Sequence, residues 1–520
     1  MEYGILSIVP PLIAIILCFI TKQVLVSLFI GIFAGSIIIS GGNPLAGAVH
    51  SLETILAAMT DNGNARLLLF NLLMGTGIAF IWKLNGSKAL TDWAKTKIKS
   101  RKSASVGAWL LGIIVFFNDY VNAAIVGNVF RDISEEHRVS SERLSYILDS
   151  TSAPVATFFI SDWIAFQIGM IQSGLDAAGI TSIRAFDGFI RSIPLNLYCI
   201  FAVLFVGMLA ISGKDFGPML KAEYRAVKEG KIIRDGGQSM MNVSFELGEP
   251  KDVKPRIMTF FLPLIALVGI TLFGFWWTGL PGDSLTEILG NADAYTALLW
   301  GAFGMSIVGI AMALISKTMD LKETMDTFLD GLKLMLLACV ILVLAWSLGG
   351  ITGEMHLADY IVSVVGDSVS FTFLPVIIFI IGMLVSFATG TSWGTMTILT
   401  PIAIPLTYNI TGDPLLSVAM AGVVFSGAIF GDHCSPISDT TVLASIFAGA
   451  DHMDHVATQI PYALTVASVA ALMFLLYGLF NLNPIILIVL GLALLAVLMY
   501  ALSSYSSKKY GIDAETKKAL

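Results

Sequence analysis

The residues best suited to chemistry lie in polar interruptions of long apolar runs. The first interruption falls inside the apolar run of residues 105–130, where Asn118, Asp119 and Asn122 supply a carboxylate and two amides. Asp119 and Asn122 are three residues apart, so they share one face of a helix. An unpaired Asp at the centre of a bilayer costs about 2.5–3.5 kcal/mol on insertion scales, so an acid in such a run is expected to have a function.

A second polar stretch follows at residues 148–154, again between apolar residues. It contributes the candidates Asp149, Ser150 and Ser152, and it ends at Pro154. Proline opens a helix because it has no backbone N–H. Carbonyl oxygens then become available beside the carboxylate and the hydroxyls.

The second half of the chain has two further interruptions of similar composition. Asp432 is followed by Ser and Pro, as Asp149 is, with an offset of one residue. The candidate binding residues of these two interruptions are Thr389, Thr391, Ser392, Asp432, His433, Ser435, Asp439 and Thr440.

Carboxylates, hydroxyls and freed carbonyls are hard oxygen ligands, which suit Na⁺, another small cation or a proton. Burial favours the protonated form of a carboxyl group, whereas a bound cation favours the ionised form. A single Asp can therefore exchange a proton for a metal ion, which is the chemistry of an antiporter. The candidate Na⁺ ligands are Asp119, Asp149, Asp432 and Ser435.

Each candidate also has a structural alternative. The acids could be hydrogen-bonded between helices, and small polar residues often only join helices. This alternative applies most to Asn118, Asn122, Ser392 and Ser435.

The stretch around His433 allows more than one role. His433 could relay protons or cap a broken helix. Adjacent residues on a helix point in different directions. A transition-metal site at residues 432–434 is therefore not expected. Asp432 and Asp439 are seven residues apart and would share a face of an unbroken helix, but Pro436 is expected to break it.

The composition defines the class of protein that holds these residues. Of 520 residues, 56% are hydrophobic and 13% are charged, whereas soluble domains average roughly 25% charged. This excludes an ordinary soluble enzyme, a disordered chain and a nucleic-acid binder, and it favours a polytopic helical membrane protein. A porin-type barrel is excluded because the apolar runs do not alternate. The four cysteines form no CxxC pair, so buried free thiols are expected.

The basic residues predict the topology. They concentrate at residues 83–102, 213–256, 317–333 and in the tail from Lys508, whereas residues 257–316 and 334–507 contain none. Cytoplasmic loops collect Lys and Arg. We therefore expect these four segments, including the C-terminus, to be cytoplasmic and the N-terminus to be external.

Orientation of the apolar runs predicts two repeats of opposite topology, each with three spans followed by an interrupted region. We expect roughly 11 to 14 membrane segments. The predicted spans lie near residues 4–20, 24–40, 67–84, 190–212, 257–280, 295–316, 333–350, 458–480 and 484–503. The predicted parts are an N-terminal transmembrane repeat (1–212), a cytoplasmic linker (213–256), a C-terminal transmembrane repeat (257–480), and a last helix with a cytoplasmic tail (481–520).

Three further expectations concern charged residues outside the interruptions. The linker is expected to form a solvated surface helix with mixed charges. Arg131 to Arg143 are expected at the interface or paired with Glu135, Glu136 and Glu142. The stretch 451–455, with two Asp and two His, is expected to be a wet loop, with pH sensing as the alternative.

In these motifs the chain resembles the NhaC family of Na⁺/H⁺ antiporters, within the wider ion-transporter superfamily. The most specific match is the run Gly431-Asp-His-Cys-Ser-Pro-Ile-Ser-Asp-Thr-Thr441. The stretches 118–122 (with Gly127), 143–154 and 391–395 also fit. The resemblance covers about residues 60–480. The family often shows paired acids where this chain has Asn118-Asp119, a departure that bears on ion stoichiometry and substrate.

The resemblance implies two inverted repeats, each with a re-entrant hairpin and a broken helix. It also implies a homodimer with an elevator-type mobile domain, set among the lipids of the bacterial cytoplasmic (inner) membrane. The partners would be Na⁺ and H⁺, and no cofactor is implied. Some members of the family couple these ions to small organic acids of the malate and lactate type.

Three functions therefore compete. The first is Na⁺/H⁺ exchange, and the second is a Na⁺- or H⁺-coupled carrier of organic acids or amino acids, whose carboxylate could meet a helix N-terminus. The third is a membrane enzyme. The sequence lacks HExxH and Walker motifs, and its GxSxG string at residues 390–394 interrupts an apolar run, so an enzyme is not expected.

Overall fold

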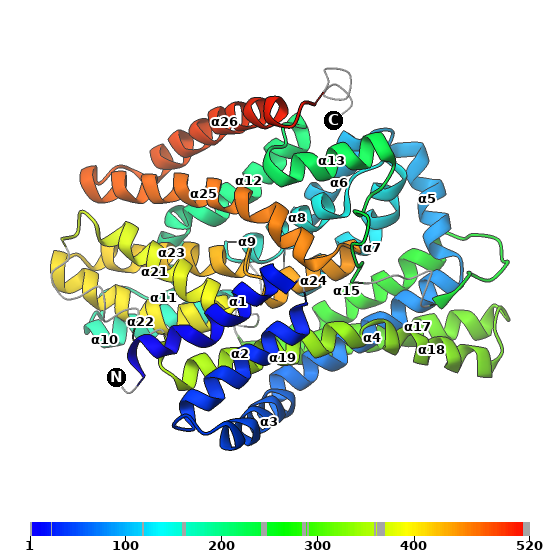
Figure 1. The fold of residues 1–520 in the computed structure, drawn as a ribbon, viewed down its shortest axis with the longest axis horizontal. Coiled ribbons are helices and arrows are strands. Elements are labelled where there is room, and N and C mark those ends of the chain that lie inside the picture. The colour runs from blue at the N-terminus through cyan, green and yellow to red at the C-terminus, as the bar shows by residue number, and fades with distance from the viewer. Residues whose placement is uncertain are drawn as a thin grey trace.

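The computed structural model describes residues 3–21, 23–116, 119–158, 163–240, 247–282, 288, 291–357, 360 and 370–512. Within these ranges the chain forms helices and connecting segments, without a β-strand. The helices lie side by side in two groups, and each group takes helices from both halves of the chain (Figure 1).

Seven of the described helical segments are long and apolar enough to cross a membrane. The segment Leu197–Glu229 includes α12 (Leu197–Ser212) and α13 (Gly217–Glu229). The other six are α4 (Asn62–Lys83), α15 (Met258–Thr278), α17 (Ala294–Ile315), α23 (Pro414–Asp432), α25 (His452–Phe480) and α26 (Pro484–Lys509). The runs predicted near 67–84, 257–280, 295–316, 458–480 and 484–503 are thus confirmed as helices.

The first group, here called the opening bundle, combines the spans that open each half. From the first half it contains α1 (Val9–Thr21), α2 (Val24–Ile39), α3 (Pro44–Thr60) and α4. From the second half it contains α15, α17, α18 (Leu321–Leu334) and α19 (Leu336–Glu354). Helix α4 packs against α17 and α18, and α19 packs against α2 and α3. These helices occupy the lower part of Figure 1.

The second group, here called the interrupted bundle, contains the polar interruptions of both halves. Its core elements are α7 (Asp119–Glu136), α8 (Ser141–Thr151), α9 (Ala153–Ala156), α21 (Leu374–Thr389), α22 (Ser392–Thr411), α23 and α24 (Asp439–Ala448). Around them lie α6 (Arg101–Ile114), α10 (Trp163–Ala178), α11 (Ala185–Ser192), α12 and α25. Helix α24 packs on α7 and α8, so the two halves interlock at their interruptions.

The sequence explains where the helices of the interrupted bundle break. Helix α21 ends at Gly390, whose φ of +70° is the left-handed conformation that glycine tolerates best. Thr391 then caps α22 by accepting a hydrogen bond from the amide of Gly394 at 3.4 Å. The chain leaves the helix again between Asp432 and Asp439, as Pro436 predicted.

Glycines also let α21 approach the chain around the second break. A Cβ on Gly390 would lie 2.6 Å from the carbonyl oxygen of Ile437, and a Cβ on Gly431 would lie 2.1 Å from the amide of Phe387. Real Cβ atoms essentially never come that close. Only glycine fits at these two contacts.

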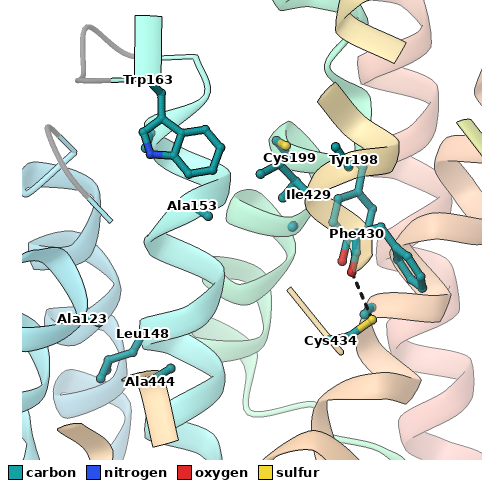
Figure 2. Packing of buried hydrophobic residues seen from close by; sticks show 14 of the residues in the cluster. Ala123, Leu148, Ala153, Trp163, Tyr198, Cys199, Ile429, Phe430, Cys434 and Ala444 are labelled. Carbon is teal, nitrogen blue, oxygen red and sulfur yellow. Dashed lines mark hydrogen bonds between the residues drawn. The ribbon is translucent and has the colours of Figure 1, made fainter. Parts of the chain in front are cut away.

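Buried side chains pack tightly around the second break, the segment between Asp432 of α23 and Asp439 of α24. Figure 2 shows Tyr198 and Cys199 of α12 beside Ile429 and Phe430 of α23. The thiol of Cys434 donates to the carbonyl oxygen of Phe430 at 3.1 Å. Cys199, Cys339 and Cys434 are free and buried, as predicted.

The linker departs from its predicted solvated surface helix. Glu223 of α13 is fully buried and accepts hydrogen bonds from Arg143 (3.0 Å), Arg101 and the amide of Ser140 (2.8 Å). Arg143 also pairs with Asp215. Arg143 was predicted at the interface or paired with Glu135, Glu136 and Glu142, but it pairs with Asp215 and Glu223, and Glu142 pairs with Arg225 of the linker at 2.8 Å. These residues are far apart in sequence, so local spacing could not indicate them.

Candidate functional site

A cavity of about 500 Å³ lies where the two bundles meet. The interrupted bundle contributes Asp119 and Tyr120 at the start of α7, Thr389 and Thr391 at the α21–α22 break, and Asp439 at the start of α24. The wall from the opening bundle includes Asn64 of α4, Tyr295 and Leu298 of α17, and Trp346 and Thr352 of α19. Two predicted acids, from different halves of the chain, thus reach one cavity.

Asp439 is held at the cavity wall by two donors. The hydroxyl of Tyr120 donates to its Oδ2 at 2.9 Å, and the amide of Thr440 donates to its Oδ1 at 2.9 Å. Asp439 lies in the first turn of α24, where the positive end of the helix dipole favours a carboxylate. Asp119 is only 3% exposed and accepts from the amide of Tyr120 at 3.1 Å.

Asp432 lies behind this wall in a cluster of oxygen atoms. Its Oδ2 accepts from Ser392 at 3.1 Å and its Oδ1 accepts from Ser438 at 2.7 Å. The hydroxyl of Thr440 contacts that of Ser438 at 3.0 Å. Thr440 therefore connects the two acids, since its amide donates to Asp439. Asp432, Ser392, Ser438 and Thr440 form what we call the Asp432 cluster.

The Asp432 cluster is buried and has no basic partner. Asp432 is 1% exposed and Ser438 is fully buried. No ion pair in the described part of the chain joins Asp432 or Asp439 to a Lys or Arg. A buried carboxylate without a counter-charge is unfavourable. The cluster is thus suited to a proton or a small cation as the missing positive charge.

Asp149 occupies a separate environment. Its Oδ2 accepts from the side-chain amide of Gln459 at 2.7 Å and lies 3.8 Å from Nε2 of His455. Its Oδ1 is buried without a hydrogen-bond partner among the described residues. The hydrogen bond of Asp149 is to α25, and its carboxyl group is near enough to Asp432 and Asp439 for their charges to interact with it.

Residues 451–455 do not form the predicted wet loop. His452 and His455 are 2% and 0% exposed, because the first turn of α25 is inserted behind α24. Only the two acids of this stretch reach the linker, where Arg234 pairs with Asp451 at 3.5 Å and with Asp454 at 2.5 Å.

His433 bridges three helices. Its Nε2 is 2.9 Å from the hydroxyl of Ser150 on α8, and its Nδ1 is 2.8 Å from the hydroxyl of Tyr198 on α12. His433 follows the last residue of α23. The two ring contacts join the break between α23 and α24 to α8 and α12. The same contacts form a path by which a proton could pass between Ser150 and Tyr198 through the ring.

Other predicted site residues make contacts that stabilise backbone breaks. The amide nitrogen of Asn122 lies within 2.5–3.0 Å of the carbonyl oxygens of Gly112, Val115 and Thr151. Ser435 donates to the carbonyl of Phe387 at 2.8 Å, and Ser152 donates to that of Asp149 at 2.9 Å. Asn118 lies outside the described residues.

Several residues of the site were not predicted from the sequence. Ser438 lies inside a quoted motif, and its position between two acids could have indicated it. Tyr120 also lies beside a predicted acid. Tyr198, Trp346 and Gln459 stand alone in apolar or mixed stretches, where neither spacing nor composition distinguishes them.

A family model described as the Na⁺/H⁺ antiporter family matches residues 155–479, which is more than half of the chain. The chain belongs to this family of transporters. The matched region includes both breaks of the second half and the Asp432 cluster. The predicted resemblance is thus confirmed, and the seven apolar helical segments belong to a multi-pass membrane protein.

Individual relatives match different shares of the chain. An uncharacterized protein of Haemophilus influenzae is 34% identical over 484 residues, which cover 91% of this chain and 90% of that protein. The Na(+)/H(+) antiporter NhaC of Alkalihalophilus pseudofirmus is 30% identical over 165 residues, 31% of this chain and 33% of the relative. The malate-2H(+)/Na(+)-lactate antiporter of Bacillus subtilis is 39% identical over 99 residues, 19% and 20% of the two chains.

Proposed function

We propose that this protein exchanges Na⁺ for H⁺ across the cytoplasmic membrane and that Asp432 binds the two ions in turn. The observation that carries the proposal is the burial of Asp432 among the hydroxyls of Ser392, Ser438 and Thr440, without a Lys or Arg partner in the described chain. Membership of the Na⁺/H⁺ antiporter family supports the choice of ions.

The proposed exchange uses the lone pairs of the cluster. In the proton-loaded state the carboxyl group of Asp432 is neutral. When Na⁺ replaces the proton, the hydroxyls of Ser392 and Ser438 turn their oxygen atoms towards the cation, and the carboxylate supplies the charge. One cation then replaces one proton on Asp432. The predicted ligands Asp119, Asp149 and Ser435 are not part of this cluster, because their hydrogen bonds are to other groups.

The position of the cavity supports a way for the site to reach both sides of the membrane. The cavity lies between the opening bundle and the interrupted bundle, and Thr440 links its wall to Asp432. Movement of the interrupted bundle as one body past the opening bundle would carry Asp432 with it. This motion is the elevator-type mechanism expected from the sequence, with two inverted repeats and a homodimer as its predicted framework.

The test is ion flux in proteoliposomes containing the purified protein. Vesicles that are acidic inside should take up radioactive Na⁺, and the uptake should collapse when a protonophore removes the pH gradient. Asp432→Asn should lower uptake at least about tenfold, because a charge-assisted contact contributes roughly 1.5–3 kcal/mol. Asp413→Asn is the matched control, since Asp413 is an exposed N-cap of α23 and Asn caps equally well. Normal uptake by Asp432→Asn would refute the assignment.

A second candidate function is exchange that also carries a small organic acid. The cavity of about 500 Å³ is far larger than one ion needs, and Tyr295, Trp346 and Trp393 line it. The N-terminus of α22, capped by Thr391, also faces it, and a helix N-terminus favours a carboxylate. The relative named a malate-2H(+)/Na(+)-lactate antiporter supports this candidate over the region it matches.

The second candidate has its own measurement. Vesicles are loaded in turn with malate, lactate and amino acids, and uptake of radioactive Na⁺ is recorded with and without each solute. Stimulation by one solute, with countermovement of that solute, would favour organic-acid exchange. Unchanged Na⁺ uptake across the panel would exclude it and leave simple Na⁺/H⁺ exchange.

A further inference from the structure

A second buried polar group lies behind the Asp432 cluster, at the start of α25. Ser445 of α24 contacts two histidines with one hydroxyl. Its Oγ is 3.0 Å from Nδ1 of His452 and 2.9 Å from Nδ1 of His455. All three side chains are buried. The hydrogens of this triad can be assigned from its outer contacts.

The outer nitrogen of His452 must carry a hydrogen. Nε2 of His452 is 2.9 Å from the carbonyl oxygen of Pro436. A backbone carbonyl can only accept a hydrogen bond. Nε2 of His452 is therefore the donor.

The outer nitrogen of His455 is assigned through Gln459. The side-chain nitrogen of Gln459 donates to Oδ2 of Asp149 at 2.7 Å and to the carbonyl oxygen of His433. Both partners accept, so the amide orientation is fixed and its Oε1 faces Nε2 of His455 at 2.6 Å. A flipped amide would place oxygen against the carbonyl of His433. Nε2 of His455 is therefore also a donor.

The inner contacts then have too few hydrogens. In two neutral rings with protonated Nε2, both Nδ1 atoms are acceptors. The carbonyl oxygen of Thr441, 2.8 Å from Oγ of Ser445, is a third acceptor. Ser445 has a single hydroxyl hydrogen for all three. A buried acceptor that lacks its donor costs about 1–3 kcal/mol.

We propose that the His452–Ser445–His455 triad is a proton-binding site. One proton adds to Nδ1 of either ring and makes it an imidazolium. That Nδ1–H donates to Oγ of Ser445, and the hydroxyl hydrogen of Ser445 donates to the other Nδ1. The triad gains one positive charge and satisfies both rings. No covalent bond other than N–H forms.

The groups around the triad can compensate this charge. Asp149 of α8 lies 3.8 Å from Nε2 of His455, and Asp451 precedes His452 as the N-cap of α25. Two positive groups also lie near the triad. Arg234 of the linker pairs with Asp451 and Asp454, and Arg131 of α7 lies against Gly449. Further charged or titratable groups on the elements packed against α25 include Asp432, Asp439, Glu142, Arg143, Asp215, Glu223, Arg225, Tyr146, Tyr198, Cys434 and His433.

The triad is connected to the break that carries Asp432. The bond from His452 reaches Pro436, and Gln459 bonds to the carbonyl of His433, so both contacts lie between Asp432 and Asp439. An imidazolium is a stronger donor than a neutral ring. Proton binding therefore strengthens the hold of α25 on the break. The role of this proton in exchange rests on the proposed function, but its existence does not.

The direct test is nuclear magnetic resonance of the full-length protein in nanodiscs, with ¹⁵N-labelled histidine. The chain has six histidines, and single His→Gln variants assign the signals. Nε2 should be protonated in both rings at every pH. Lowering the pH should protonate Nδ1 in one of the two rings. A neutral Nδ1–H tautomer in either ring, or two neutral rings down to the pH of unfolding, would overturn the inference.

A variant tests the bridging hydroxyl. Ser445→Ala removes the group that accepts from the imidazolium, so proton uptake by the pair should move to lower pH, and the pH profile of Na⁺ uptake should move with it. The apparent KM for Na⁺ at saturating proton load should stay unchanged. Ser417→Ala is the matched control, because buried Ser417 makes only the local bond to Asp413 at 2.7 Å. An unshifted Ser445→Ala profile would count against the bridge.

The two hypotheses fail in different ways. Wild-type protein that protonates the triad but shows no Na⁺ uptake would refute the proposed exchange and leave the proton site intact. Wild-type protein that exchanges Na⁺ while both rings stay neutral would refute the proton site alone.

Discussion

Asn122 and Asp432 are both polar residues in apolar runs, yet their hydrogen-bond partners differ in kind. Asn122 donates to backbone carbonyls where α6 and α8 end, so its amide completes the main-chain bonding of two helix ends. Asp432 accepts only from hydroxyls, which can turn to present oxygen to a cation. At the scale of the residue, the kind of hydrogen-bond partner therefore distinguishes Asn122, a structural amide, from Asp432, a candidate ion ligand.

This distinction predicts the effect of replacing Asn122. Asn122→Ala should lower the free energy of unfolding by about 2 kcal/mol or more, because buried carbonyls that lose a donor cost roughly 1–3 kcal/mol each. The apparent affinity for Na⁺ should not change. Thermal unfolding in detergent and Na⁺ uptake measure the two effects. Asn128→Ala is the control, since Asn128 makes one local bond to Ala124 at 2.7 Å. A loss of Na⁺ affinity at full stability would contradict the structural role.

At the scale of the element, the breaks depend on close contact between segments. Gly390 ends α21 in the left-handed conformation and lies against Ile437 in the second break. Gly412 ends α22 in the same conformation, with φ of +65°, but has open space around its Cβ position. Both glycines thus adopt the left-handed backbone conformation, but of the two only Gly390 is packed against another segment.

Alanine at these two positions separates the two effects. Both Gly390→Ala and Gly412→Ala should be destabilised by about 1–2 kcal/mol through left-handed backbone strain. Gly390→Ala should lose further stability and most Na⁺ uptake, because the methyl group displaces the segment between Asp432 and Asp439. Unfolding midpoints and initial uptake rates compare the pair. Equal behaviour of the two variants would show that the contact with Ile437 is unimportant.

The sequence predicted elements better than it predicted partners. Hydropathy located most long helices, and Gly390 and Pro436 marked the breaks, because both signals act within a few residues of the chain. Glu223 was predicted on a solvated helix and not beside Arg143, since this pairing is set by how α13 docks against α8. His452 and His455 were predicted in a wet loop because the stretch 451–455 holds four charged or titratable residues. Their burial depends on packing of α25 behind α24.

At the scale of the whole molecule, the linker is bound to the interrupted bundle through buried charges. Arg143 of α8 pairs with Asp215 and Glu223, and the hydroxyl of Tyr462 donates to Asp215 at 2.7 Å. Arg143 is 5% exposed, so water screens this network little. The linker therefore belongs mechanically to the bundle that carries Asp432.

Removing the central cation should release the linker. Arg143→Met leaves two buried carboxylates facing each other, and breaking a buried pair from one side costs about 3–5 kcal/mol. The variant should unfold at lower temperature, and trypsin should cut between residues 221 and 234 faster than in the wild type. Arg184→Met is the control, because the Arg184–Asp187 pair is exposed and such pairs contribute about 0–1 kcal/mol. Equal trypsin cleavage in both variants would refute the docking role.

The two bundles meet at the cavity, and their relative motion can be blocked there. A Cβ on Gly349 of α19 would lie 3.8 Å from the carbonyl oxygen of Thr389 of α21, so these two positions are in contact across the bundles and are chosen for a cysteine pair. In a background with the native cysteines replaced, oxidation of Gly349→Cys/Thr389→Cys should abolish Na⁺ exchange, and reduction should restore it. The oxidised protein is compared with the same protein reduced, which removes any effect of the substitutions themselves.

A cross-link within one bundle provides the second comparison. Phe166 of α10 and Trp393 of α22 stack with ring centroids 4.2 Å apart, and both helices belong to the interrupted bundle. If that bundle moves as one body, oxidation of Phe166→Cys/Trp393→Cys should leave the exchange rate of the reduced protein unchanged, while the cross-link between bundles stops it. Exchange at the reduced rate in both oxidised proteins would exclude movement of the interrupted bundle past α19. Arrest by both would instead indicate that transport requires rearrangement inside the interrupted bundle, between α10 and α22.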